Sequence, residues 1–317
     1  MNVLNALIGL AVGDALGVPV EFESREYLIE NPITDMIGYK AHYQPLGTWS
    51  DDTSLALCLA DSLCNGYNLY DISKKIISWY DNAIWTPNGK VFDIGDTTKK
   101  SIIKLKKILE NNELENIIFN EFLERENGNG SLMRILPLVF FVKDMNIEEK
   151  FKYIREVSSL THGHIRSCIA CLIYICYASN LLKNEDKFIA YTDMQKEINN
   201  FLSIINTSSI EKDNFTRILQ NDISKLPIEE IYSTTYVIHT LEASLWNILN
   251  HSDYETTVLS AVNMGDDSDT TASVTGGLAG IIYGIDKIPE KWVECLAKKD
   301  ELFKLAETLN NSINTIY

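Results

Sequence analysis

Basic residues are scarce in this sequence relative to acidic ones. Its 317 residues include 28 Lys and Arg against 44 Asp and Glu, which gives a net charge of −16 at pH 7. Duplex nucleic acid and anionic membranes bind proteins through basic surfaces that release counterions. The charge balance therefore argues against either one as the main partner, while leaving room for a local basic patch.

Cysteine is also sparse, and its spacing shows no disulfide framework. The six cysteines do not form the dense, regular set that staples small secreted domains. Cys168 and Cys171 have the spacing of a redox or zinc pair, but the surrounding segment 165–176 has the composition of a buried helix. We favour packed thiols over a redox or zinc site.

A basic leader and a long apolar run are missing as well. The N-terminus carries no basic segment, and its apolar run is interrupted at Gly13-Asp14. We take 272–283 as the longest stretch of small and apolar residues, and it falls short of the roughly 20 apolar residues that a membrane span needs. We expect a cytoplasmic protein with no membrane partner.

Helical periodicity is what the sequence has in quantity. In 53–64 the apolar residues fall at positions i, i+3, i+4 and i+7, which is typical of a helix. The same kind of spacing predicts helices in 68–81, 98–110, 147–158, 165–182, 236–249 and 296–309, with Pro289 just inside a helix start. We predict an all-α fold in a single domain over residues 1–317. Segments 36–39 and 139–142 are too short to assign, and the polar stretch 183–226 is a lid, an insertion or a set of surface helices.

Two acidic clusters directly precede apolar helices. In the first, 47–53, the simplest interpretation is a helix start with Ser50 as N-cap and Asp51 and Asp52 in the first turn, where the helix dipole favours negative charge. The second, 265–271, packs three carboxylates and three hydroxyls into six positions before a helix of small residues.

Like charges so close together are unfavourable without a counter-ion. Oxygen ligands with no nearby Cys or His suit Mg²⁺, Mn²⁺ or Ca²⁺ rather than zinc. If Asp51 and Asp52 meet Asp267 and Asp269 in space, four carboxylates match two divalent ions, which predicts a site that orients a substrate and polarises an oxygen or a bound water. Two unrelated helix caps are the alternative.

A third polar cluster, 127–134, forms a glycine-rich turn before an apolar segment. Exposed backbone N–H groups at such a turn suit a phosphate, and a plain turn is an equally good interpretation. Arg134 in this cluster is expected to bind an anion or to pair with an acid.

Six motifs in order along the chain carry a family resemblance. They are Gly9-x-x-x-Gly13-Asp14-Ala15-Leu16-Gly17-x-Pro19-x-Glu21, Trp49-Ser50-Asp51-Asp52-Thr53, Phe92-Asp93-Ile94-Gly95-Asp96-Thr97-Thr98, Gly128-Asn129-Gly130-Ser131-Leu132-Met133-Arg134, Thr161-His162-Gly163-His164 and Gly265-Asp266-Asp267-Ser268-Asp269-Thr270. Together they resemble the ADP-ribosylglycohydrolases, a family that includes the dinitrogenase reductase-activating glycohydrolase. The resemblance covers residues 6 to about 285.

This resemblance implies an all-α domain with two Mg²⁺ or Mn²⁺ ions in a cleft, and cleavage of the bond between ADP-ribose and an acceptor. The metal ligands that it implies are Ser50, Asp51, Asp52, Asp267, Asp269 and Thr270. The residues that it implies for binding substrate are Gly128, Asn129, Gly130, Ser131, Met133, His162 and Tyr236. For His162 a capping or core role is an alternative, and for Tyr236 a core aromatic is favoured over a stacking platform.

Two carboxylates are candidates for catalysis under the same resemblance. Glycosidic cleavage passes through a cationic centre, which a carboxylate stabilises while a second group activates water or assists the leaving group. Glu21 matches the catalytic acid of some family members, and Asp93 matches a base proposed in others. We favour Asp93 for an arginine-like leaving group and Glu21 for an O-linked one. Asp14 is interpreted as structural.

Three positions depart from the family pattern: Asp96 stands where Asn is frequent, Ser50 replaces Thr, and Asp266 adds a carboxylate. The expected function is a metal-dependent hydrolase that removes ADP-ribose from a modified acceptor, most readily arginine on a protein. The alternatives are an ADP-ribose-binding or crystallin-like structural protein, a hydrolase of O-linked or nucleic-acid-linked ADP-ribose, and a metal-dependent phosphohydrolase. Loops 22–46 and 183–230 are expected to form the acceptor surface.

Overall fold

The computed structural model describes residues 2–119, 122–183, 186–205 and 207–316. Within these ranges the chain forms α-helices and short 3₁₀ turns, and its β pairing is a single isolated bridge between Gly128 and Tyr236. The predicted all-α fold class is confirmed. The helices are α1 (Asn2–Gly17), α2 (Arg25–Glu30), α3 (Asp51–Leu63), α4 (Leu69–Asn82), α5 (Asp96–Glu110), α6 (Val139–Val142), α7 (Ile147–Ser159), α8 (Ile165–Leu182), α9 (Lys187–Ile204), α10 (Ser209–Asp213), α11 (Thr216–Leu219), α12 (Val237–Asn250), α13 (Tyr254–Val262), α14 (Ser268–Tyr283), α15 (Glu290–Cys295) and α16 (Lys299–Ile316).

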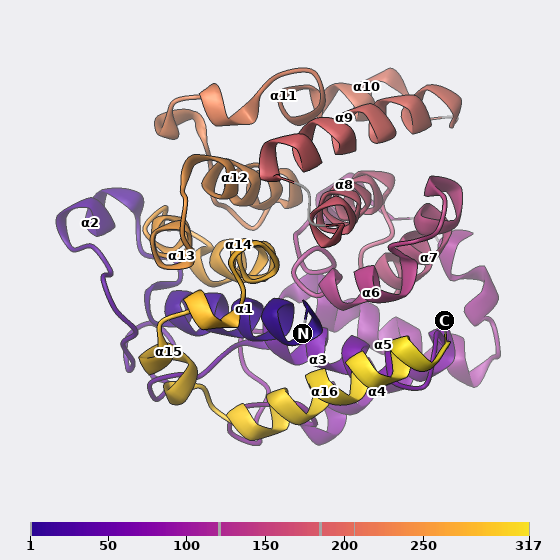
Figure 1. The fold of residues 1–317 in the computed structure, drawn as a ribbon. Helices are drawn as coiled ribbons and strands as arrows, with labels where there is room; N and C mark the ends of the chain where they lie inside the picture. Colours follow the sequence, from indigo (N-terminus) through magenta and orange to yellow (C-terminus); the bar gives the residue numbers. More distant parts are fainter. Residues whose placement is uncertain (1, 120–121, 184–185, 206, 317) are drawn as a thin grey trace.

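Helices α1 and α14 pack against each other in the centre of the molecule (Figure 1). Gly9, Gly13 and Gly17 recur every four residues and so lie on one face of α1. A Cβ atom on Gly13 would stand 2.1 Å from the carbonyl oxygen of Ala272, and one on Gly9 would stand 2.3 Å from that of Gly276. The two helix backbones are therefore in direct contact, and a side chain at these positions would force them apart.

Helix α1 continues through Gly13-Asp14, where the apolar run of the sequence is interrupted. Gly13 serves the contact with α14, while the Asp14 carboxylate finds its partners on another helix, as described below. Two helical segments, Asn2–Val20 and Ile165–Leu182, are long and apolar enough to cross a membrane by length and composition, whereas the sequence analysis had singled out 272–283. They are 94% and 89% buried inside the fold, which is typical of core helices.

The helices predicted from periodicity are present as α3, α4, α5, α7, α8 and α12. The C-terminal prediction is wrong in detail, because α15 and α16 are separate helices and Pro289 is the N-cap of the first. The segment before α3 packs against the break between these two helices. Trp49 donates its indole N–H to the carbonyl of Ala297, at 2.9 Å, and the Ala297 N–H donates to the carbonyl of Gly47. Of the two unassigned segments, 139–142 is helix α6 and 36–39 is irregular.

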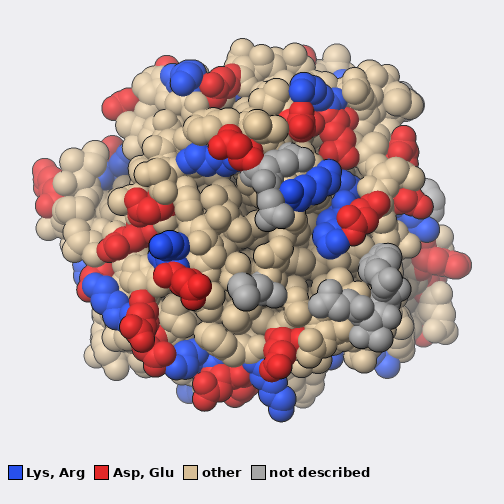
Figure 2. All heavy atoms as spheres, in the orientation of Figure 1, with Lys and Arg blue, Asp and Glu red and all other residues tan. Residues whose placement is uncertain are grey.

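The described part of the polar stretch 183–226 forms surface helices. Helices α9, α10 and α11 make an outer layer at the top of the view in Figure 1, and α9 buries Met194, Ile198 and Phe201 on its inner side. The six cysteines are free, and Cys168 and Cys171 are buried, as the interpretation as packed thiols predicted. On the face shown in Figure 2, acidic and basic side chains are interspersed rather than gathered by sign.

Candidate active site

The two acidic clusters lie together at the N-termini of α3 and α14. Ser50 is the N-cap of α3, and its hydroxyl accepts the backbone N–H of Asp52 at 3.2 Å, as the capping pattern predicted. Asp267 precedes α14, and the Thr270 hydroxyl in the first turn of α14 donates to Oδ2 of Asp52 over 3.3 Å. Two clusters more than 200 residues apart in sequence are thus joined directly, and the alternative of two unrelated caps is excluded.

Asp14 fixes the start of α3 from the side of α1. Its carboxylate accepts the backbone N–H groups of Ser50 and Thr53, at 2.9 and 3.0 Å, and the Thr53 hydroxyl at 2.6 Å. Burial raises its pKa to about 6, and these hydrogen bonds oppose the shift. Asp14 therefore acts as a structural anchor for α3, as the sequence analysis interpreted it.

The carboxylates in this cluster are buried with few hydrogen-bond donors. Asp51, Asp52, Asp267 and Asp269 are each at most 4% exposed. Burial and the neighbouring carboxylates raise the pKa of Asp51, Asp52 and Asp269, and burial raises that of Asp267. Both carboxylate oxygens of Asp269 and Oδ1 of Asp52 have no hydrogen-bond partner among the described residues. Buried polar atoms without partners are costly, so the cluster is built for a positively charged ligand.

Glu21 and Asp93 extend the acidic cluster toward solvent. Oxygens of Glu21, Asp267 and Asp269 lie within 4.8 Å of one another. Two backbone hydrogen bonds hold the loop that carries Glu21. The Phe22 N–H donates to the Asp266 carbonyl at 2.6 Å, and the Asp266 N–H donates to the Glu23 carbonyl at 2.8 Å. Burial, followed by the charges nearby, raises the pKa of Glu21 and of Asp93 to about 8 each.

The glycine-rich loop is attached to the same cluster. The Asn129 side-chain amide donates to Asp267 Oδ2 over 2.6 Å and to the Thr240 hydroxyl over 2.9 Å, and its backbone N–H donates to Thr235. The bridge between Gly128 and Tyr236 fixes the loop against the start of α12. The Ser131 hydroxyl turns inward instead, where it accepts a hydrogen bond from a buried serine of α7.

Arg134 neither binds an exposed anion nor pairs with an acid, contrary to expectation. Its guanidinium is buried and donates to the Gly130 carbonyl at 2.6 Å, the Thr161 hydroxyl at 2.7 Å and the Val157 carbonyl at 3.0 Å. The reason lies in α7 and the following turn, which surround the side chain and leave carbonyl oxygens as its acceptors. Arg134 thus braces the glycine-rich loop from behind.

His162 lies against the glycine-rich loop in neutral form. Burial and the nearby guanidinium of Arg134 lower its pKa to about 3. Its Nδ1 lies 2.8 Å from the Thr161 hydroxyl, which also accepts from Arg134. Its Nε2 lies on the side of Gly128 and Gly130. A Cβ on Gly130 would stand 2.7 Å from the ring, so only glycine allows this contact.

Tyr236 is half-buried at the rim rather than in the core that the sequence analysis favoured. Its hydroxyl accepts from Arg166 over 3.2 Å, and its ring stands edge-on to His239. Arg166 also binds Glu211 of α10 through two nitrogens, at 2.9 and 2.8 Å. The outer helical layer therefore reaches the rim of the site through Arg166.

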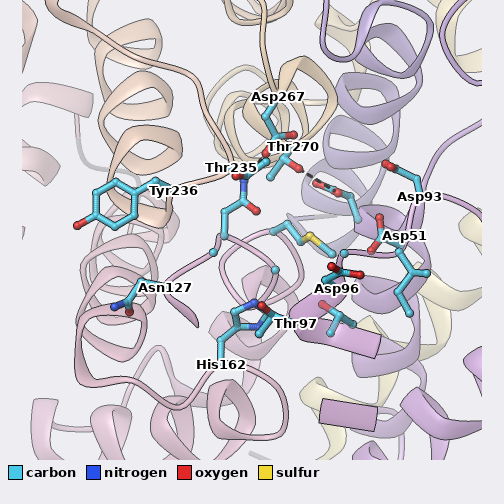
Figure 3. Close-up of a pocket in the computed structure, with 18 of the residues that line it drawn as sticks. Asp51, Asp93, Asp96, Thr97, Asn127, His162, Thr235, Tyr236, Asp267 and Thr270 are labelled. Atoms are coloured by element: carbon cyan, nitrogen blue, oxygen red, sulfur yellow. Dashed lines mark hydrogen bonds between the residues drawn. The ribbon is translucent and has the colours of Figure 1, made fainter. Parts of the chain in front are cut away.

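These groups surround a cleft of about 620 Å³. In Figure 3, Asp51, Asp93, Asp267 and Thr270 gather at one end, and Tyr236 lies at the other. The predicted residues that line the cleft are Glu21, Asp51, Asp52, Asp93, Gly128, Asn129, Gly130, Met133, His162, Tyr236, Asp267 and Thr270. Ser50, Ser131 and Asp269 are buried beside it.

Several lining residues were not among the site residues that the sequence predicted. They are Phe22, Ile94, Gly95, Asp96, Thr97, Thr98, Glu124, Arg125, Asn127 and Thr235. Residues 94–98 stand inside a motif that was recognised, so their position beside Asp93 was the available signal. Residues 124 and 125 had no such signal, and Arg125 is the one basic side chain among the described residues that line the cleft.

The two segments expected to form the acceptor surface differ. The first contributes Phe22 to the cleft wall and His42 beside Glu21. No described residue of 183–230 lines the cleft, and this segment contacts the rim through Glu211. Asp266 is exposed, so the extra carboxylate faces solvent rather than the buried cluster.

Known proteins were compared with the whole chain. The profile of the ADP-ribosylglycohydrolase family matches residues 2–316. The ADP-ribosylarginine hydrolase Tri1 of Serratia proteamaculans is 31% identical, with 96% of this chain and 77% of the relative covered. The ADP-ribosyl-[dinitrogen reductase] glycohydrolase of Rhodospirillum rubrum is 26% identical over 94% of this chain and 91% of its own.

A solved structure described as an ADP-ribosylglycohydrolase-related protein complex superposes with a TM-score of 0.79 at 28% identity, covering 98% of both chains. Family profile, relatives and fold agree over nearly the full length of the chain. The chain belongs to the ADP-ribosylglycohydrolase family, which includes these ADP-ribosyl hydrolases.

Proposed function

We propose that this protein is a divalent-metal-dependent hydrolase that releases ADP-ribose from arginine side chains of a modified protein. The observation that carries the metal dependence is the buried Asp269 carboxylate, neither oxygen of which has a hydrogen-bond donor. The arginine linkage is supported by the relatives at 30 and 31% identity that are described as ADP-ribosylarginine hydrolases.

The residues present fit two hard cations. Carboxylate and hydroxyl oxygens are the preferred ligands of Mg²⁺ and Mn²⁺, and the four buried aspartates would balance two divalent ions in charge. The residues that would hold them are Ser50, Asp51, Asp52, Asp267, Asp269 and Thr270. Bound ions would supply fixed oxygen ligation for the ribose hydroxyls and for a water molecule.

The other end of the cleft is suited to the diphosphate and the adenosine. Neutral His162 places its Nε2 beside the backbone of Gly128 and Gly130, and with its hydrogen on Nε2 the ring would offer an uncharged donor to phosphate oxygens. Tyr236 lines the cleft at the rim, with the Arg166 guanidinium over its ring. This arrangement would hold the ADP-ribosyl group with the anomeric carbon at the acidic end.

Glu21 and Asp93 are the carboxylates positioned for the bond change. The C–N bond between the ribose and the guanidino nitrogen breaks as positive charge develops on the ribose, and a nearby carboxylate stabilises that charge. The departing nitrogen takes up a proton, and water adds to the anomeric carbon. Because burial raises the pKa of both groups to about 8, the pair retains a proton near neutral pH. We assign the base to Asp93 and the hydrogen-bonded role to Glu21.

The test is product analysis on a panel of ADP-ribosylated substrates linked through arginine, serine and phosphate, with Mg²⁺ or Mn²⁺ and with EDTA. We expect free ADP-ribose from the arginine linkage and none in EDTA. Asp269→Ala should lower turnover by about 10³-fold or more and abolish Mn²⁺ binding in calorimetry.

Asp266→Asn is the matched control, because Asp266 is an exposed aspartate three residues away and asparagine tolerates its left-handed backbone. It should retain full activity. Full wild-type activity in EDTA would refute the metal dependence, and release from another linkage alone would refute the arginine assignment.

A further inference from the structure

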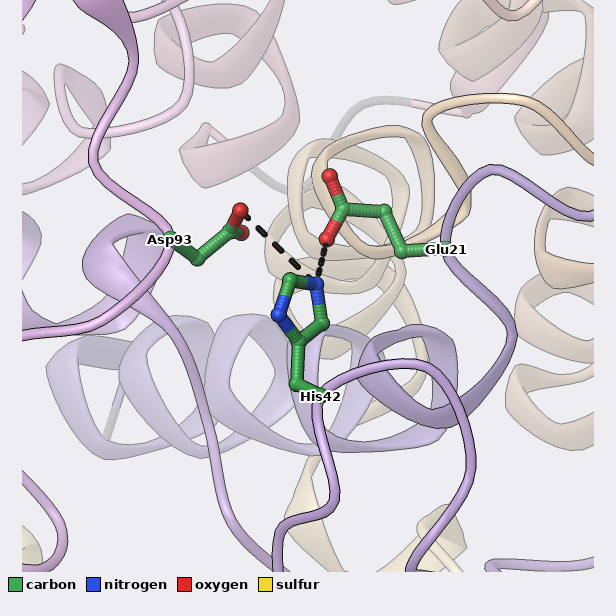
Figure 4. A group of neighbouring side chains, drawn as sticks. All are labelled: Glu21, His42 and Asp93. Atoms are coloured by element: carbon green, nitrogen blue, oxygen red, sulfur yellow. Dashed lines mark hydrogen bonds and ion pairs between the residues drawn. The ribbon is translucent and has the colours of Figure 1, made fainter.

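A histidine that no motif singled out lies between the two candidate catalytic carboxylates. His42 Nε2 contacts Glu21 Oε2 at hydrogen-bonding distance and stands 3.7 Å from Asp93 Oδ1 (Figure 4). Glu21 is 4% exposed in this contact, Asp93 16% and His42 22%. The three side chains come from three separate loops, so this meeting does not follow from the packing of any one helix.

Left-handed backbone lies at Asp93 and directly after Glu21 and His42. Asp93 has φ 57°, while Phe22, next to Glu21, has φ 63° and Tyr43, next to His42, has φ 52°. Left-handed backbone at such residues costs free energy and gathers where function requires a fixed geometry. Strain shared by three loops that converge on one point indicates that this point is functional.

Local hydrogen bonds hold the loop of His42 in place. The Ala41 N–H donates to the Pro19 carbonyl over 3.0 Å, and the Tyr43 N–H donates to the Lys40 carbonyl over 3.1 Å. The first of these bonds ties the loop to the turn that immediately precedes Glu21. The loop of His42 and the turn before Glu21 are therefore bound to each other, and the imidazole of His42 contacts Glu21.

The contact of His42 is selective for one of the two carboxylates. His42 Nε2 and Glu21 Oε2 share one hydrogen, which lies on Nε2 when Glu21 is ionised and on Oε2 when Glu21 is protonated. At 3.7 Å, Asp93 is outside hydrogen-bond reach of the same nitrogen. Nε2 therefore hydrogen-bonds Glu21 and not Asp93.

We propose that His42 is a positioning residue that holds Glu21 through the hydrogen bond between Nε2 and Oε2 and thereby leaves Asp93 to act as the base. This inference rests on the proposed hydrolase function, and it adds a residue and a division of labour to that function. His42 does not touch the reacting atoms. It acts through Glu21.

A double-variant cycle tests the coupling. The variants are His42→Ala, His42→Gln, Glu21→Gln and the combination of His42→Ala with Glu21→Gln, with kcat and KM measured on arginine-linked substrate in Mn²⁺. We expect His42→Ala to lower kcat about tenfold or more with KM changed by less than about twofold. The double variant should be no slower than Glu21→Gln alone, because both changes remove the same contact.

The conservative variant and a loop control separate positioning from mere structure. His42→Gln retains a side-chain N–H donor and should recover most of the lost kcat. Tyr43→Asn alters an exposed neighbour with left-handed backbone and should leave kcat unchanged. Mn²⁺ affinity should be the same in all His42 variants. Additive losses in the double variant, equal losses in His42→Ala and His42→Gln, or weaker Mn²⁺ binding would overturn the proposal.

A spectroscopic readout keeps the proposal independent of the substrate assignment. The chain has five histidines, and comparison with His42→Gln identifies the ring nitrogens of His42 in ¹⁵N NMR. The Nε2 resonance of His42 should shift in Glu21→Gln more than in Asp93→Asn. A larger shift in Asp93→Asn would overturn the proposal. Absence of wild-type turnover on the arginine substrate would refute the proposed function alone.

Discussion

The acids of the cleft fall into two groups that are held in different ways. Asp51, Asp52, Asp267 and Asp269 stand at the N-termini of α3 and α14, which are fixed by the backbone contact with α1 and by Asp14. Glu21 and Asp93 stand on loops, beside left-handed backbone and against His42. The comparison teaches that the rigid core positions the carboxylates proposed to bind ions, whereas strained loops position the carboxylates proposed for catalysis.

The first prediction tests the helix packing that positions the four helix-borne aspartates. Gly13→Ala places a Cβ 2.1 Å from the Ala272 carbonyl oxygen, and because that atom is backbone the two helices must separate. We expect a loss of about 3 kcal/mol or more in the free energy of unfolding, measured by urea denaturation. Gly95→Ser is the control, since a Cβ there meets nothing within 4 Å and serine is a good N-cap for α5. Equal losses in both variants would show that the contact is not tight.

The second prediction concerns how the stability of the protein depends on pH, with and without Mg²⁺. Glu21 and Asp93 have pKa values raised to about 8 from ordinary values of 4.5 and 3.8, so the ion-free folded protein holds more protons than the unfolded chain between those limits. Stability without metal should therefore fall as pH rises from about 4 to 8. Saturating Mg²⁺ should restore about 3 kcal/mol at pH 8 and far less at pH 5.5.

Thermal unfolding with Mg²⁺ and with EDTA at the two pH values measures this difference. Asp266→Asn should show the same profile as the wild type, because Asp266 is exposed to solvent. If Mg²⁺ stabilised the protein equally at both pH values, the buried carboxylates would not be the ion-binding groups.

The third prediction concerns the loop-borne group and is the smallest effect. Phe22→Gly removes the penalty of left-handed backbone but adds freedom to the unfolded chain, so stability should change by less than about 1 kcal/mol. Turnover should nevertheless fall a few-fold, since Glu21 loses a fixed neighbour. Asn112→Gly, at φ 57° near the end of α5, should match it in stability with no change in turnover. Unchanged turnover in Phe22→Gly would show that loop strain does not serve the site.

The same division explains what the sequence could predict. Ser50-Asp51-Asp52 before an apolar helix carries a capping pattern, so the helix start and the repulsion between its carboxylates could both be predicted. The second cluster could be predicted in the same way. His42 lies in a loop without periodicity, and its contact with Glu21 depends on backbone angles that the residue types do not specify.

Arg134 shows another limit of sequence reasoning. A charged side chain after a glycine-rich loop suggests an anion site. Its acceptors are instead the Gly130 carbonyl four residues earlier and two groups that only the tertiary fold brings near, the Thr161 hydroxyl and the Val157 carbonyl. The split between α15 and α16 has the same origin, because it depends on the docking of the segment around Trp49.

The contact between α1 and α14 also determines when the protein can become active during its synthesis. Helix α1 is complete at Gly17, but its partner surface extends to Gly280. At synthesis rates of about 5–20 residues per second, the apolar α1 helix waits roughly 13–50 s for that surface to be made. Both acidic clusters therefore assemble only when translation is nearly finished, and a truncated chain would expose its first helix to chaperones instead of forming a hydrolase.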